Sequence, residues 1–129
     1  MHTICADLGS TVTKIIEVDE KNKIINKNIY QKENPEKLLK EFIEKNNINP
    51  ENIETIVTTG VGILEKQNFL EIPVIRIDEF KAIGTGGLAV SGKSNVIVAS
   101  IGTGTAFIKA NNNEMKHLGG SRSRWRSIL

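Results

Sequence analysis

Residues 3–19 read TICADLGSTVTKIIEVD, and this stretch decides the fold. Its first part, residues 3–8, alternates weakly between apolar and polar side chains and runs into a glycine, which predicts a strand ending in a tight turn. Its second part, residues 12–19, is rich in β-branched side chains and predicts a second strand. The sequence therefore begins with two strands joined by a short turn of small residues.

The residues that follow extend this pair into an antiparallel meander and then change to a helix. A polar turn at residues 21–23 precedes a third predicted strand over residues 24–30. Asn34 and Pro35 form a helix start signal, because asparagine accepts a hydrogen bond from a free N–H and proline fits the first turn. Apolar side chains then recur at helical spacing, which predicts a helix over residues 35–46.

The rest of the chain alternates between predicted strands and helices, and the strands repeatedly end in glycine turns. Two more helices are expected, over residues 62–68 and from Glu79 to about Ala89. The β-rich segments predict strands at residues 53–58, 73–77, 95–101, 105–110 and 114–118. This order predicts a single α/β domain, a mixed sheet with flanking helices, and no repeat or linker divides it.

Composition narrows the class of protein. The chain has 129 residues, of which 39% are hydrophobic and 5% aromatic, so one core of Ile, Val and Leu is expected. No stretch approaches the ~18–20 apolar residues of a membrane span, and the N-terminus lacks the features of a signal peptide. Cys5 is the only cysteine, so the chain forms no internal disulfide and no cysteine-rich metal site. A cytoplasmic location is expected.

The charge is unevenly distributed. Residues 1–121 carry 14 basic and 15 acidic side chains, a net charge of −1, whereas the whole chain has +2. The difference comes from the arginines of residues 122–129, which also hold the only tryptophan. Residues 1–121 are therefore close to neutral and lack the excess of positive charge that is typical of proteins binding DNA or RNA. We therefore separate residues 1–121 from an aberrant basic tail, residues 122–129, which is either a short extension or the product of a frameshift.

The first glycine turn suits a phosphate group. Gly9, Ser10 and Thr11 offer backbone N–H groups and hydroxyls in one small turn between two predicted strands. Asp7 precedes the turn and could hold Mg²⁺ directly or through water, and Lys14 on the next strand could reach back to the phosphates. A plain hairpin with a glycine-serine turn explains the same residues, and taken alone it is the simpler interpretation.

A second turn of the same kind follows about ninety residues later. Gly102, Thr103 and Gly104 again lie between two predicted strands, and small residues let the backbone approach an anion. The turn is not a P-loop, because no Lys-Ser/Thr and no helix follow it. Two such hairpins, the first preceded by an aspartate, form a moderately specific pattern for a phosphate clamp.

A third candidate opens the predicted helix after residue 78. Glu79 could take the proton of a substrate hydroxyl as that hydroxyl attacks a phosphate. Capping of the helix by two acids in its first turn is the alternative, and the residue types alone favour it. Neither His2 nor His117 has an acid at useful spacing, and Cys5 is expected in the core rather than as a nucleophile.

Together these residues resemble the N-terminal lobe of the acetate and sugar kinase–Hsp70–actin superfamily, and within it most closely the type II pantothenate kinases. The resemblance spans residues 3–121 and depends on the order and spacing of its motifs. The matching motifs are Asp7 to Lys14, Thr58 to Gly60, Asp78 to Phe80 followed by Gly84, Ile101 to Thr105, and Leu118 to Ser121.

The resemblance implies a ribonuclease-H-like fold and a set of roles. Glu79 would be the general base toward pantothenate, and Asp7 would serve Mg²⁺. The residues around the ATP phosphates would be Gly9, Ser10, Thr11, Lys14, Gly102, Thr103, Gly104, Gly119, Gly120 and Ser121. The implied reaction transfers the γ-phosphate of ATP to the primary alcohol of pantothenate, the first step toward coenzyme A, and the family works as homodimers.

Two related groups share part of this pattern. Gly-Ser-Thr in the first turn, where pantothenate kinases commonly have Gly-Gly-Thr, is similar to the ATPase activators of 2-hydroxyacyl-CoA dehydratases and benzoyl-CoA reductases. Those activators hold an iron–sulfur cluster through cysteines at their dimer interface, and this chain has no such cysteines. The Gly-Thr-Gly-Thr turn favours the kinase. The superfamily also includes N-acetylglucosamine kinases, which motifs separate imperfectly from pantothenate kinases.

The length departs from the family, because its kinases close ATP between two lobes and 129 residues supply one. Residues 124–126 read Arg-Trp-Arg and can be encoded by codons that give Gly-Gly-Gly one base away. The shifted frame would restore the family's glycine loop after Ser121. We therefore expect a frameshift near this residue and little kinase activity from the chain alone; a non-catalytic remnant that dimerises is the other possibility.

Overall fold

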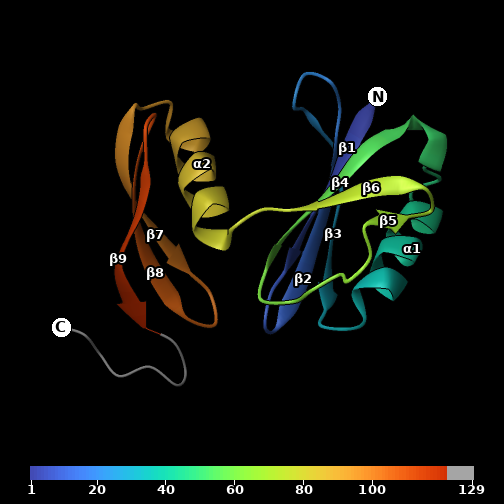
Figure 1. Cartoon of the computed structure of the whole chain (residues 1–129), viewed down its shortest axis with the longest axis horizontal. Coiled ribbons are helices and arrows are strands. Elements are labelled where there is room, and N and C mark those ends of the chain that lie inside the picture. Colours follow the sequence, from blue (N-terminus) through green and yellow to red (C-terminus); the bar gives the residue numbers. More distant parts are fainter. Residues whose placement is uncertain (122–129) are drawn as a thin grey trace. The chain divides into compact units, whose positions relative to one another are not determined.

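The computed structural model describes residues 1–121 as two compact units, which are treated separately below (Figure 1). Unit 1 is Met1–Ile77, and unit 2 begins at Asp78. The expectation of one lobe over residues 1–121 stays a prediction, and the proposed frameshift tail lies outside the described residues. No helix among the described residues is long and apolar enough to span a membrane.

Unit 1 is built on a six-stranded mixed sheet in the order β3-β2-β1-β4-β6-β5. The first three strands form the predicted antiparallel meander, whereas β1, β4 and β6 run parallel. The elements are β1 (His2–Leu8), β2 (Val12–Val18), β3 (Ile24–Gln31), α1 (Pro35–Lys45), the 3₁₀ turn η1 (Pro50–Asn52), β4 (Ile53–Gly60), β5 (Asn68–Phe69) and β6 (Ile72–Arg76).

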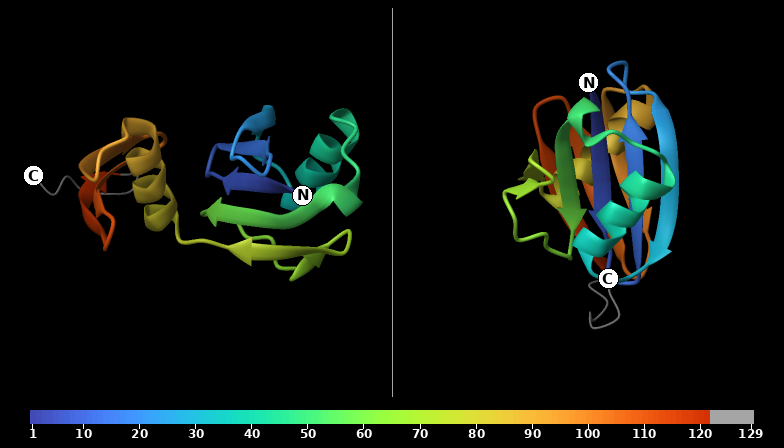
Figure 2. Two further views of the ribbon diagram at one scale, coloured as in Figure 1. Left: turned by 90° about the horizontal axis from the view of Figure 1, so that it is seen from above. Right: turned by 90° about the vertical axis from the view of Figure 1, so that its right-hand side faces the viewer.

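Helix α1 covers one face of this sheet (Figure 2). It begins as predicted, with the Asn34 side chain accepting a hydrogen bond from the Lys37 N–H and proline in the first turn. Its apolar stripe, which includes the fully buried Phe42, packs on the alternate residues of β1 that point the same way. Because side chains alternate across a strand, Cys5 and Asp7 lie on the other face of β1.

The predicted helix over residues 62–68 is wrong. This segment follows the end of β4 in an irregular conformation, and only Asn68 belongs to a strand. Gly62 donates its N–H to the Leu8 carbonyl at 2.9 Å, and the Gln67 carbonyl accepts from the Val74 N–H at 2.8 Å. Backbone groups that a helix would pair internally are therefore bound to other parts of unit 1.

Unit 2 consists of α2 (Glu79–Ser91) on one face of an antiparallel three-stranded sheet, β7 (Asn95–Ile101), β8 (Thr105–Asn111) and β9 (Met115–Ser121). Two glycines allow the close packing of helix on sheet. An added Cβ at Gly84 would lie 2.3 Å from the sulfur of Met115, and one at Gly87 would lie 2.2 Å from Val98. Phe80 also stacks on His117, with ring centroids 4.3 Å apart.

The other face of this small sheet bears no helix among the described residues, and large apolar side chains are exposed on it beside Lys109 and Lys116. Its exposed large apolar side chains are Ile97, Ile101, Phe107 and Leu118. β7 alternates strictly between half-buried residues and exposed ones, which is the pattern of a sheet covered on one side. Together with unit 1, this arrangement confirms the expected α/β class with a mixed sheet and flanking helices.

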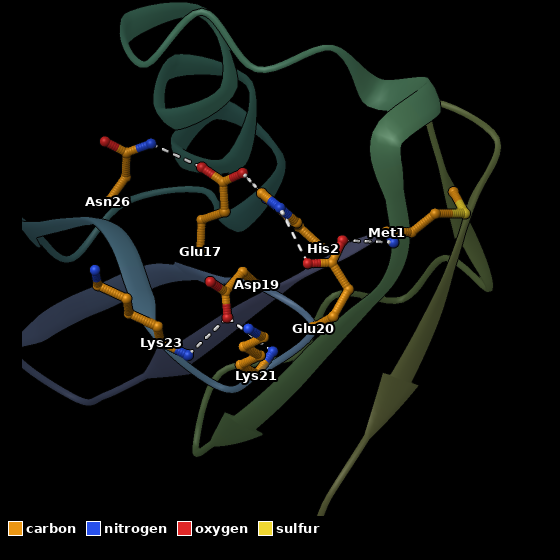
Figure 3. A network of polar contacts seen from close by, with 8 residues as sticks. All are labelled: Met1, His2, Glu17, Asp19, Glu20, Lys21, Lys23 and Asn26. Carbon is orange, nitrogen blue, oxygen red and sulfur yellow. Dashed lines mark hydrogen bonds and ion pairs between the residues drawn. The ribbon is translucent and has the colours of Figure 1, made fainter.

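A buried carboxylate links the starts of β1 and β3 to the end of β2 (Figure 3). Glu17 is 6% exposed, and its two oxygens accept from His2 Nδ1 at 2.8 Å and Asn26 Nδ2 at 2.7 Å. Glu20, nearby, pairs with the Met1 amine at 3.1 Å. The expectation that His2 lacks a partner acid is therefore wrong, because strand pairing brings an acid fifteen positions away beside it.

We predict that Glu17→Ala lowers the free energy of unfolding by about 1–3 kcal/mol, because it leaves two part-buried donors unpaired. The control, Glu54→Ala, removes an exposed carboxylate of β4 that has no partner among the described residues, and should change stability by less than about 0.5 kcal/mol. Urea unfolding followed by circular dichroism measures both. Equal effects in the two variants would show that the network does not stabilise unit 1.

Candidate phosphate-binding site

The first predicted turn lies where β1 ends and β2 begins. Asp7 is directly opposite Lys14 on β2 and opposite Thr59 on β4, so the three side chains lie on one face of the sheet. Asp7 and Lys14 are exposed, and neither forms a hydrogen bond or ion pair with the described residues. A carboxylate and an ammonium group are thus available to a ligand at this end of the sheet.

The turn itself is closed tightly by glycine and displays hydroxyl groups. A Cβ at Gly9 would lie 2.5 Å from the Val12 carbonyl oxygen, so a larger residue would displace the backbone. Ser10 and Thr11 are exposed. The structure brings this turn of small residues together with Asp7 and Lys14, and its use by phosphate oxygens stays a prediction.

A second loop, residues 60–62, lies beside the end of β1, where this turn begins. Gly60 has φ = 96°, and a Cβ on it would lie 2.6 Å from the Leu8 carbonyl oxygen and 2.9 Å from Asp7 Oδ1. Arg76, at the end of β6, donates to the carbonyls of Gly60 and Gly62, the latter at 2.8 Å. Sequence reasoning missed this arginine, although it is the only one in residues 1–121.

The second predicted turn joins β7 to β8 in unit 2. The Gly102 N–H donates to the Gly104 carbonyl at 2.8 Å, so this donor is used within the turn. Gly102 and Thr103 are exposed. The turn therefore presents exposed backbone and a threonine side chain, while one of its expected N–H donors is already occupied.

The third glycine segment lies beside this turn. In β9, Gly120 pairs with Ala106 and Ser121 pairs with Thr105, the residue that follows the turn. A Cβ at Gly120 would lie 2.0 Å from the Thr105 carbonyl oxygen, so only glycine fits there. Strand pairing thus places Gly119, Gly120 and Ser121 at the same end of the sheet as the turn of residues 102–104.

Two carboxylates lie at the start of α2, and only one of them caps the helix. Asp78 caps the helix, because its Oδ2 accepts from the Lys81 N–H at 3.1 Å. Glu79 is half-buried and has no hydrogen-bond or ion-pair partner among the described residues. Capping therefore occupies Asp78 and leaves Glu79 open to other chemistry.

The predicted site residues form two groups. Unit 1 brings together Asp7, Lys14 and the turn of residues 9–11. Unit 2 holds Glu79 with the two glycine segments of β7, β8 and β9. The residues of each group belong to one unit. The phosphate clamp, which needs the turn of residues 9–11 and the turn of residues 102–104 together, therefore stays a prediction.

The residues present fit a Mg²⁺ ion that binds together with phosphate groups, rather than one held by protein side chains alone. No group of three or more His, Cys, Asp or Glu side chains that could hold a metal occurs among the described residues. Mg²⁺ usually keeps several waters and binds one or two carboxylates together with substrate phosphates. Asp7, exposed beside the hydroxyls of the turn, supplies the one carboxylate that this mode needs.

A cleft in unit 1 lies away from this site. It is an open space of ≈ 510 Å³ at the opposite end of the strands, lined by residues that include His2, Glu17, Asn46 and Asn49. None of the predicted site residues lines it. Both oxygens of Glu17 are already bound there, so this carboxylate is structural.

Cys5 is half-buried on the face of β1 opposite α1 and is not part of the hydrophobic core, so the expectation of a core position is wrong. Burial raises the pKa of its thiol above the ordinary value of 9.0. Because only the thiolate reacts, we predict slower alkylation by iodoacetamide at pH 7.5 in the folded chain than in urea. The folded-state rate should still climb above pH 9, and the raised pKa should make folding less stable as pH rises through that range. Equal rates in the two states, measured by mass spectrometry, would contradict this.

Comparison with known proteins shows the fold. No model of a known protein family matches the sequence, and no curated protein matches it either. Solved structures do match by fold. One is the activator of the 2-hydroxyisocaproyl-CoA dehydratase from Clostridium difficile with bound ADPNP, at TM-score 0.65 and 20% identity over 92% of this chain and 46% of that one.

Two further structures agree. Component A of the Acidaminococcus fermentans (R)-2-hydroxyglutaryl-CoA dehydratase matches at TM-score 0.66 and 20% identity, over 91% of this chain and 47% of that one. A ROK family glucokinase from Streptomyces griseus, in complex with glucose and AMPPNP, matches at TM-score 0.66 and 16% identity, over 95% and 48%. The chain therefore has the actin-like ATPase fold and spans about half the length of these proteins.

Proposed function

We propose that this chain is the N-terminal part of an ATP-dependent kinase that phosphorylates pantothenate in the cytoplasm, acting as a homodimer. The observation that carries the proposal is the end of β1 and β2, where Asp7, Lys14 and the glycine-serine-threonine turn meet, all exposed or half-buried. Neighbours of the same fold that were solved with ATP analogues support an ATP site. The choice of pantothenate depends on the sequence resemblance.

The proposed roles follow from the chemistry of each group. Ser10, Thr11 and Lys14 bind phosphate oxygens, and Asp7 holds Mg²⁺, which neutralises charge on the phosphates when bound. Glu79 accepts the proton of the pantothenate hydroxyl as its oxygen forms a bond to the γ-phosphorus. The bond from that phosphorus to the bridging oxygen of ADP breaks, and ADP leaves with the electron pair.

In unit 2, the turn of residues 102–104 and the segment of residues 119–121 would complete the phosphate contacts. Both segments present backbone at one end of a sheet, and glycine permits the close approach of an anion. Gly102 contributes no N–H in the described conformation, because this donor is bound to Gly104. The contacts would therefore come from the remaining groups of the turn.

An ATPase activator of a 2-hydroxyacyl-CoA dehydratase is the second candidate. One structural neighbour is the activator of a 2-hydroxyacyl-CoA dehydratase and another is component A of such an enzyme, and the Gly9-Ser10-Thr11 turn resembles the activator sequences. The two candidates differ in their acceptor, because a kinase transfers the phosphoryl group to an alcohol and an activator transfers it to water. An activator would also need cluster-binding cysteines in residues beyond this chain.

The deciding experiment follows ADP release in a coupled assay with Mg·ATP, with and without pantothenate. The 129-residue chain is tested as it stands. If sequencing of the gene reveals a shifted frame after the codon for Ser121, the protein which that frame encodes is tested beside it. Release that depends on pantothenate, with little from the 129-residue chain alone, is expected. Release without an acceptor favours the activator, and release that needs N-acetylglucosamine favours a sugar kinase. A folded chain whose melting temperature does not change when Mg·AMPPNP is added favours a non-catalytic remnant.

A further inference from the structure

The loop that follows β4 is held from two sides. On one side, Gly62 donates its N–H to the Leu8 carbonyl at 2.9 Å, which attaches the loop to the last residue of β1. On the other side, Arg76 donates through two nitrogens to the carbonyls of Gly60 and Gly62. The loop is therefore fixed between the ends of β1 and β6.

This loop lies directly against the proposed magnesium ligand. The space over Gly60 is so narrow that a Cβ would come within 2.9 Å of Asp7 Oδ1. A Cβ at Gly62 would come within 2.8 Å of the Leu8 Cβ. The loop backbone therefore leaves no room for even a methyl group beside the Asp7 carboxylate or the end of β1.

Arginine is better suited than lysine to bind the two carbonyls of this loop. Its planar guanidinium offers donors in a fixed fork that can reach two carbonyls at once, whereas the lysine ammonium acts as a single point on a flexible stem. Arg76 forms no ion pair with an acid among the described residues, and its guanidinium donates to the two loop carbonyls instead. Parallel pairing of Thr58 with Arg76 sets the base of the side chain one strand away from the loop.

We propose that Arg76 is a positioning residue for the phosphate site: its two hydrogen bonds hold residues 60–62 against the end of β1 and thereby fix the Asp7 carboxylate for Mg²⁺. This inference rests on the proposed function for the role of Asp7, and on the contacts above for the role of the arginine. The arginine itself touches neither nucleotide nor acceptor in this proposal.

The test compares Arg76→Gln and Arg76→Lys with Lys27→Gln, which removes an equal charge from an exposed position on β3 that has no partner among the described residues. The first readout needs no ligand. Amide hydrogen exchange at Gly62 should speed up about tenfold in Arg76→Gln, because hydrogen bonds to a charged donor are among the stronger ones. The ¹³Cγ resonance of Asp7 should move as well, while amides of β3 keep their protection.

The second readout is the Mg²⁺ concentration needed for binding of AMPPNP. Loss of a partner bonded directly to a metal ligand typically weakens metal binding by about 10- to 100-fold. Arg76 acts on Asp7 only through the loop, so Arg76→Gln should show a loss at the lower end of this range, about tenfold. Arg76→Lys should recover part of it, because lysine can still reach one carbonyl. Lys27→Gln should match the unsubstituted chain in both readouts.

Two results would overturn the inference. One is an unchanged Gly62 exchange rate and Asp7 resonance in Arg76→Gln. The other is uniform loss of protection across unit 1, which would make Arg76 a general stabilising residue. If the unsubstituted chain binds no AMPPNP, the proposed function fails in this chain, whereas the ligand-free readout still decides whether Arg76 fixes Asp7.

Discussion

Phe42→Ala is expected to lower the free energy of unfolding by about 3–5 kcal/mol, the range for removing a fully buried aromatic side chain. Phe42 is 0% exposed and lies at the centre of the contact between α1 and the six-stranded sheet. Domains of this size are stable by only about 5–15 kcal/mol, so the variant should be largely unfolded in unit 1 at modest urea concentrations.

The matched control is Phe107→Ala in unit 2. Phe107 is 42% exposed on the face of β8 that no described helix covers, so its loss should cost about 1 kcal/mol or less. Urea unfolding by far-UV circular dichroism gives the totals, and amide hydrogen exchange shows which unit opens. A loss below 1 kcal/mol for Phe42→Ala would mean that α1 does not hold unit 1 together.

Under the proposed function, Glu79→Gln should lower kcat for pantothenate phosphorylation by about 10²–10⁴-fold with little change in KM. Glutamine keeps the shape and hydrogen-bonding ability of the side chain but cannot take up the proton of the hydroxyl. The effect is therefore confined to the chemical step. Steady-state kinetics with saturating Mg·ATP measure it.

Asp78→Asn is the control for this experiment. Asp78 caps α2 through the Lys81 N–H, and asparagine caps a helix about as well as aspartate. The control should therefore keep both kcat and the melting temperature. Equal losses of kcat in the two variants would show that the start of α2 acts through its structure, and would remove the general-base role from Glu79.

The parts of the fold that local signals determine were predictable. The meander follows from a glycine turn between β-branched segments, and α1 begins at the predicted residue because Asn34 and Pro35 act on their own neighbours. The pairing of Asp7 with Lys14 also follows locally, since a short turn fixes the register of adjacent strands. These features need no knowledge of distant residues.

The rest depends on contacts between segments far apart in the sequence. Residues 62–68 were predicted as a helix, but their backbone groups bind Leu8 and Val74 instead. The partners of Arg76 and Glu17 likewise come from other strands or loops. A single sequence carries no local sign of such pairs, although a lone arginine among thirteen lysines marked residue 76 as unusual.

The central place of β1 has a consequence for the order of folding. Its antiparallel partner β2 follows at once, whereas its parallel partner β4 must come from beyond β3 and α1. Closing the short loop is fast, and long-range parallel pairing is slow. During synthesis or refolding, the turn of residues 9–11 should therefore form well before Gly60 and Arg76 reach it. Under the proposed function, nucleotide binding by refolding chains would therefore report the last stage of assembly rather than the first.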